Sequence, residues 1–134
     1  MNRCLTVLPT ILLLPILSAC EMSTAELLDR AARAREAGEL SEASIHLRNA
    51  LQTDPTNLQA RLELGDVMLS LNDPRGAQQQ FERAISQGAQ LDGYALAYCR
   101  SLVLGGSLES ALEYCGDERV PEAEDEVDAN QNNL

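Results

Sequence analysis

Small and apolar residues recur along this chain with a period of 34 residues. The stretch 24–57 aligns without a gap on 58–91, and a third stretch keeps the register from Asp92 to about Cys115. Small residues match in all three copies: Ala31, Gly65 and Cys99 form one set, and Ala43, Ala77 and Ala111 another. A fixed period of this length is typical of stacked helical hairpins. The pattern predicts an all-α protein, a short solenoid of three antiparallel hairpins that binds other molecules.

Capping residues predict the bounds of six helices. Ser23 and Glu26 indicate a capping box at the start of the first helix, and Gly38 supplies a left-handed stop after it. Asp73 before Pro74 is a favourable start for the fourth helix, because proline suits the first helical position. The other expected starts are Ser41, a box of Thr56 and Gln59, Asp92 and Ser107; the expected ends are Ala37, Thr53, Leu71, Gln87, Gly105-Gly106 and Gly116. No segment shows the alternation of a strand.

Residues 1–19 are expected to be a signal peptide and not part of the fold. Arg3 gives a positive start, and the apolar run of residues 5–17 is shorter than the roughly 20 residues that span a bilayer. The ending Leu17-Ser18-Ala19-Cys20 resembles the cleavage signal of bacterial lipoproteins. This resemblance implies that Cys20 is the first mature residue and carries the lipid. The alternative is an ordinary signal peptide, with Cys20 incidental.

The expected location is inferred from the residue after the cleavage site. Glu21 is not the aspartate that, in enterobacterial-type sorting, retains lipoproteins at the inner membrane. The short segment 20–23 is therefore expected to be a lipidated N-terminus in the outer membrane, and the domain is expected to face the periplasm. Two or more acyl chains give stable anchoring, whereas a single chain gives only marginal binding.

Charge argues against a nucleic-acid partner. The net charge is −11, from 21 acidic and 10 basic residues, so no basic stripe is available to neutralise phosphates. Residues 117–134 carry seven of the acids and one arginine and hold little apolar content. A disordered acidic tail is expected there, since the segment cannot bury enough apolar surface to fold. It also lacks the ligand pattern of an EF-hand calcium loop.

The repeats of residues 24–57, 58–91 and the partial 92–116 resemble the tetratricopeptide repeat family. The matching residues are small or apolar at the family's packing positions: Ala31, Ala43, Leu47, Ala50 and Pro55 in the first repeat, and Leu64, Gly65, Ala77, Phe81 and Ala84 in the second. The departures are Leu27, Arg61 and Ala95, which stand where the family has an aromatic residue, and Ala89, which replaces a proline. The resemblance implies a domain over 24–116 that binds proteins and has no enzymatic activity.

A narrower resemblance concerns lipoproteins that accompany PEP-CTERM and exosortase systems in exopolysaccharide-producing bacteria. It is carried by three phrases: residues 38–43, 47–55 and 60–65. Those relatives are far longer, and this chain is similar only to their N-terminal part. The likeness implies a role in envelope assembly or in export of exopolysaccharide or protein.

The family resemblance also implies a binding face for an extended peptide, formed by the first helix of each hairpin. Carried onto this chain, its positions are Leu28, Ala32, Arg35, Leu62, Asp66, Leu69, Leu96, Arg100 and Val103. Mixed charges between apolar residues suit a peptide with mixed side chains. The alternative is that the leucines are inter-repeat core and the charges are solvated, because helical apolar stripes are usually core.

Few other residues suggest chemistry. Cys99 and Cys115 lie eight residues on either side of Ser107, where the chain turns, so they can form a disulfide in an oxidising periplasm or remain two buried thiols. His46, the only histidine, is expected to be exposed and has no catalytic partner in sequence. No catalytic residue, cofactor or metal site is predicted.

The sequence supports three functional hypotheses. The first is a membrane-anchored adaptor for a protein or extended peptide partner in envelope assembly or export. The second is a pilotin-like escort that delivers a secretin or pilus subunit. The third, a hydrolytic envelope enzyme, needs a polar cluster in the groove that the predicted face residues do not provide.

Overall fold

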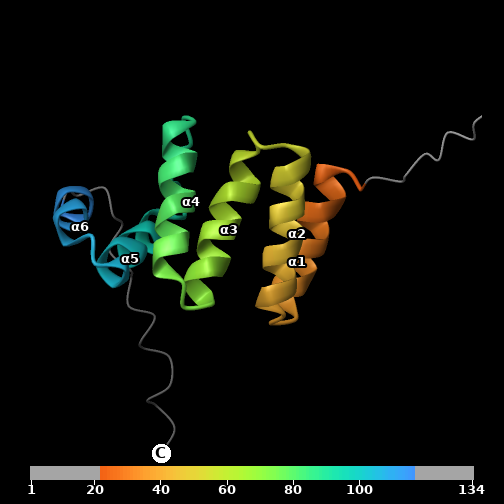
Figure 1. Ribbon diagram of the computed structural model, residues 1–134, viewed down its shortest axis with the longest axis horizontal. Coiled ribbons are helices and arrows are strands. Elements are labelled where there is room, and N and C mark those ends of the chain that lie inside the picture. Colours follow the sequence, from red (N-terminus) through yellow and green to blue (C-terminus); the bar gives the residue numbers. More distant parts are fainter. Residues whose placement is uncertain (1–21, 117–134) are drawn as a thin grey trace, which may run out of the picture.

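The computed structural model describes residues 22–116, which form six helices and no strand (Figure 1). The all-α prediction is confirmed for this part of the chain. Both the predicted signal peptide with Cys20 and the predicted acidic tail lie outside the described residues. The helices are α1 Thr24–Glu36, α2 Leu40–Thr53, α3 Leu58–Ser70, α4 Pro74–Ser86, α5 Ala95–Gly105 and α6 Leu108–Cys115.

Each helix packs against the next one along the chain, so the six form a row of antiparallel neighbours. Contacts between α3 and α5 also join the first helices of two successive hairpins. Figure 1 shows α1 and α2 at one end of the row and α5 and α6 at the other. This arrangement agrees with the predicted stack of hairpins.

The turn inside each hairpin uses the same left-handed residue position. Gly38, Asn72 and Gly106 have φ values of 76°, 63° and 87°, and they are spaced by the repeat length. The stops predicted at Gly38 and Gly106 are confirmed. The stop at Asn72 is not among the predicted ones, although asparagine is among the side chains that adopt this conformation at least cost. The three turns therefore reproduce the sequence period in the backbone.

Three predicted helix starts are confirmed, because Ser23, Asp73 and Ser107 are the N-cap residues of α1, α4 and α6, the last without a side-chain capping bond. Ser23 Oγ accepts a hydrogen bond from the Glu26 amide at 3.2 Å, and Asp73 Oδ1 accepts one from the Gly76 amide at 2.9 Å. The first capping box is only half formed, because the Glu26 carboxylate pairs with Arg30 at 3.0 Å.

Three predicted starts are wrong. Ser41 lies inside α2, which begins at Leu40 because the tight turn that closes α1 leads directly into it. Asn57 caps α3 in place of Thr56, whose hydroxyl donates to Asp54 instead. The fifth helix begins at Ala95 and not at Asp92, because residues 92–94 form a turn with Gly93 at a φ of 78°.

Small residues at the helix crossings are fully buried, as predicted. Ala31, Ala43 and Ala50 are 0% exposed in the first hairpin, as are Ala77 and Ala84 in the second. Two core clusters result. The first joins hairpin one to α3, and the second joins α3 and α4 to the last hairpin through Phe81, Tyr98 and Leu102.

Gly65 is required by the packing of the second hairpin. A Cβ at this position would lie 2.9 Å from Cζ of Phe81, whose side chain is 0% exposed. The Phe81 ring is bordered in turn by Tyr94 and Tyr98, with ring centroids 6.3 and 5.8 Å away. The missing side chain of Gly65 therefore provides the space that the phenyl ring occupies.

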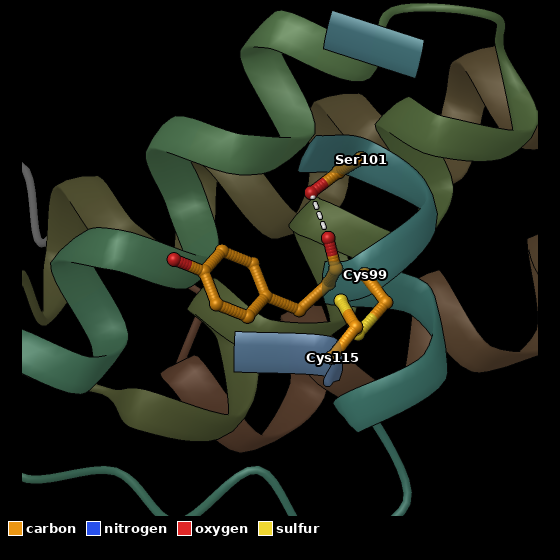
Figure 2. The surroundings of a disulfide bond; sticks show 4 residues. Cys99, Ser101 and Cys115 are labelled. Carbon is orange, nitrogen blue, oxygen red and sulfur yellow. Dashed lines mark hydrogen bonds between the residues drawn. A yellow bond between two sulfur atoms is a disulfide. The ribbon is translucent and has the colours of Figure 1, made fainter. Parts of the chain in front are cut away.

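The last hairpin is closed covalently. Cys99 in α5 and Cys115 at the end of α6 are joined by a disulfide, with their Cα atoms 5.9 Å apart (Figure 2). Beside them, the buried Ser101 hydroxyl donates to the Tyr98 carbonyl at 2.6 Å. Of the two states open from sequence, the structure adopts the disulfide. The disulfide ties the short α6 to α5.

Candidate protein-binding groove

An open groove of about 420 Å³ lies between α1 and α3, the first helices of the first two hairpins. We call it the α1–α3 groove. Its lining combines small or apolar residues with charged side chains. The lining residues are Ala32, Arg35, Glu36, Leu40, Asp66, Val67 and Ser70.

An ion pair between the two helices fixes the charges of the groove. Arg35 Nη2 donates to Asp66 Oδ2 at 2.7 Å, and Arg35 Nη1 lies 3.9 Å from Glu63 Oε2. Glu63 is only 9% exposed, and its other oxygen accepts from Gln59 Nε2 at 2.9 Å. Because each group has a charged or polar partner, the cluster holds its geometry without a ligand.

Tyr94, just before α5, is packed against the second core cluster. Burial raises the pKa of its hydroxyl, and the negative charge of Glu63 raises it further, while Arg35 lowers it. These charge effects place Tyr94 within electrostatic reach of the Arg35 cluster. At neutral pH the hydroxyl is therefore protonated and available as a hydrogen-bond donor.

The nine predicted face residues separate into three groups. Ala32, Arg35 and Asp66 lie together in the α1–α3 groove. Leu28 is partly buried against the first core cluster. The remaining five form a third group on α3 and α5. Leu62 and Leu69 belong to the core and are 8% exposed each. Leu96, Arg100 and Val103 are exposed on α5.

This distribution corrects the prediction for Leu62 and Leu69. Both residues pack in the second core cluster, together with Tyr98 and Leu102 of α5. The third hairpin covers them, so they offer no surface to a partner. The nine-residue face expected from the repeat register is therefore interrupted in the folded chain: one accessible part lies at the α1–α3 groove, and a separate one lies on α5.

Neither Glu63, which lies beside Arg35, nor Tyr94 was among the predicted face residues. Glu63 is three residues before Asp66, and this helical spacing places both side chains on one side of α3. The spacing could have identified Glu63 from sequence. Tyr94 offered no such signal, because it lies in the turn before α5 that was predicted to be helical.

The predicted exposure of His46 is wrong. Its side chain is 14% exposed, and its Nδ1 is buried with no hydrogen-bond partner. A surface hollow next to it is lined by Arg30 and Arg33 of α1 together with Glu42, whose carboxylate lies 3.4 Å from His46 Nε2. The side chain is thus packed between the two helices of the first hairpin, where the sequence register indicated solvent.

Within residues 22–116, no group of three or more histidine, cysteine or acidic side chains is placed to hold a metal ion. Among the helices that the structure describes, none combines the length and apolar character needed to cross a bilayer.

Comparison with known families agrees with this architecture. The family model of the tetratricopeptide repeat matches residues 34–97, from the last turn of α1 to the start of α5. A search of curated proteins found no match for the chain. The matched region contains the whole second hairpin and every residue that lines the α1–α3 groove except Ala32. Residues 34–97 therefore carry a tetratricopeptide repeat, a type of repeat that generally mediates protein–protein binding.

Proposed function

We propose that this protein is an adaptor that binds an extended segment of a protein partner in the α1–α3 groove. The observation that carries the proposal is the Arg35–Asp66 ion pair, which stands in an open groove between two first helices of a tetratricopeptide-type stack. The groove offers small and apolar contacts beside fixed charges. Such a surface recognises side chains of a peptide and contains no nucleophile and base arranged for catalysis.

The charges suggest which peptide is bound. The cluster sets the carboxylates of Glu36, Glu63 and Asp66 against the single guanidinium of Arg35. This excess of negative charge favours a segment that contains a basic residue, because complementary charges guide encounter and register.

A charge-swap pair tests the groove. In the Arg35→Asp, Asp66→Arg variant the two opposite charges exchange helices, so the pattern of charge offered to a ligand at these two positions is inverted. The matched control is Asp29→Arg, Arg33→Asp, which inverts the exposed ion pair on α1 outside the groove. The protein made as Cys20→Ser is used to capture partners from a membrane extract. We expect capture to fall at least about tenfold for the groove swap and to persist for the control.

Thermal unfolding of both variants verifies that each one folds. If the folded groove swap captures the same partners as the parent protein, the groove is not the binding site.

We further propose that the adaptor is a lipoprotein held at the outer membrane and facing the periplasm. The support is the lipoprotein-like sequence that ends in Cys20, together with a disulfide between Cys99 and Cys115 that suits an oxidising compartment. Labelling with palmitate should be lost in Cys20→Ser and retained in Cys4→Ser. Label that persists in Cys20→Ser would exclude this anchor.

The process we propose is cell-envelope assembly, with export of exopolysaccharide or protein as the specific pathway. The support is the similarity of residues 38–43, 47–55 and 60–65 to lipoproteins of exosortase systems. Deletion of the gene, with polymer release measured against a strain expressing Cys20→Ser, tests both the pathway and the need for the anchor.

A further inference from the structure

The last hairpin exposes a large share of the apolar side chains on the surface of the described residues. Five leucine and valine side chains of α5 and α6 are about half or more exposed: Leu96 48%, Val103 52%, Leu104 58%, Leu108 60% and Leu112 78%. The three on α5 share one side of that helix, because spacings of seven and eight residues return to the same side. The two on α6 are four residues apart, which also places them on one side. We call these five residues the end face.

The repeat register shows what normally covers this surface. Leu96 and Val103 correspond to Leu62 and Leu69 of the preceding repeat, which are 8% exposed because α5 packs over them. Leu112 likewise corresponds to Gln78, whose side-chain oxygen accepts a hydrogen bond from Ser107 of the third hairpin. The end face therefore includes positions that the next hairpin covers in the preceding repeat.

The opposite end of the stack cannot fill that place. In the second repeat, α3 docks on the first hairpin through Ala60, Leu64 and Val67. The same positions in α1 are occupied by Glu26, Arg30 and Arg33. These charged residues are exposed, and they form ion pairs within α1: Arg30 with Glu26 at 3.0 Å and Arg33 with Asp29 at 2.6 Å. Docking α1 of a second molecule on the end face would bury those charges against leucine, which is unfavourable.

The segment after α6 is also a poor cover by composition. Residues 117–134 hold seven acidic residues and one arginine. A segment that covers an apolar face needs an apolar stripe of its own, and the apolar residues here are few and mostly small: Val120, Ala123, Val127, Ala129 and Leu134.

We propose that the end face binds a second copy of itself, so that two molecules pair tail to tail about a two-fold axis. A two-fold interface requires a patch that complements itself. The end face meets this requirement: its apolar residues surround the exposed Arg100, while Glu109 and Glu113 follow Leu108 and Leu112 by one position on α6. Opposed copies can thus place arginine near carboxylate around a leucine centre.

The size of the patch sets the expected strength. A stable interface buries roughly 800 Å² per partner and about 20–30 residues a side, and the end face with its three charged residues is smaller. We therefore expect a dissociation constant on the order of 10 μM, a weak dimer.

Sedimentation equilibrium over about 1 to 200 μM tests this proposal, using the full chain made as Cys20→Ser without reductant. The variant Leu108→Ser, Leu112→Ser removes two side chains that already face solvent, so its fold is expected to be intact. Ile45→Ser is the control, because Ile45 is 54% exposed on α2, away from the end face. We expect a monomer–dimer equilibrium for the parent and the control, and a dissociation constant raised at least about 100-fold for the double variant.

Several outcomes would overturn the proposal. A parent protein that stays monomeric at the highest concentration would show that no second copy occupies the end face. Unchanged dimerisation of the double variant would place the interface elsewhere. Mass that grows beyond the dimer would indicate head-to-tail association. The groove swap Arg35→Asp, Asp66→Arg should leave dimerisation unchanged, so failure of the dimer is separate from failure of the proposed function.

Discussion

Replacing Gly65 with alanine tests how tightly the second hairpin is packed. The new Cβ would lie 2.9, 3.0 and 3.1 Å from three ring carbons of Phe81, whereas carbon atoms pack best at about 3.5–4.0 Å. The ring cannot retreat freely, because it is 0% exposed and packs against Tyr98, with the ring centroids 5.8 Å apart. Overpacking of this kind costs about 1–3 kcal/mol.

A second effect opposes the first. Alanine is favoured over glycine inside a helix by about 1 kcal/mol. We therefore expect Gly65→Ala to lower the free energy of unfolding by about 1 kcal/mol in net terms, which corresponds to a fall in Tm of roughly 4–8 °C for a domain of this size. Urea unfolding followed by helical circular dichroism measures the change.

The first repeat supplies the compensating substitution. There, the positions of Gly65 and Phe81 are held by Ala31 and Leu47, and both residues are 0% exposed. Phe81→Leu alone should cost about 1–2 kcal/mol by leaving a cavity beside the glycine. Combined with Gly65→Ala it copies the first repeat, so the double variant should be more stable than additivity predicts by about 1 kcal/mol or more. If Gly65→Ala alone stabilises the protein, or if the two effects simply add, the packing argument is refuted.

Three further predictions concern stability. Replacing Cys99 and Cys115 together by alanine should lower the free energy of unfolding by about 3 kcal/mol, as expected for a loop of this size. In urea unfolding, reductant should lower the stability of the parent by a similar amount and leave the double variant unchanged. Asn72→Gly should be neutral or stabilising by a few tenths of a kcal/mol, and Asn72→Ala destabilising by about 1 kcal/mol, because the left-handed turn suits glycine best; a cost for glycine in thermal unfolding would contradict this. Burial raises the pKa of Tyr94 and Tyr98 above the ordinary value of 10.0, so the folded state holds these protons more tightly than the unfolded state. The free energy of unfolding should therefore decline as pH rises above about 10. The decline with pH should be shallower in Tyr94→Phe, and an equal decline in both proteins would refute the burial of the Tyr94 hydroxyl.

The hairpin order could be predicted from sequence because it rests on short-range rules. The period placed the small residues Ala43 and Ala77 at the crossings, and glycine marked the turns at Gly38 and Gly106. Each of these effects depends on a residue and its near neighbours. The structure agrees at every one of these positions.

Local competition explains the missed start of α3. Asp54, Thr56 and Asn57 can all cap a helix, and they lie within four residues of one another. Thr56 bonds to Asp54 at 2.7 Å, which leaves Asn57 to accept from the first turn of α3. Capping preference ranks these side chains too closely to decide between them from sequence.

The site was harder to predict because the burial of a face residue depends on whether another hairpin packs over its repeat. Leu62 and Leu96 occupy equivalent positions, yet the first is 8% and the second 48% exposed. The sequence register treats them alike, and only the presence of α5 over one and not the other separates them. The same reasoning accounts for Leu69 and Val103, so a face carried over from family positions must be corrected at the end of a short stack.

The shared left-handed position of Gly38, Asn72 and Gly106 has a consequence for how such a chain can lengthen. Since the turn inside each described hairpin has its left-handed residue at the same repeat position, a tandem duplication of 58–91 would insert an extra hairpin whose inner turn keeps that residue in register. The chain can therefore lengthen by a whole repeat in a single duplication. An insertion inside a repeat that is not a whole repeat long would break the regular spacing of these left-handed residues.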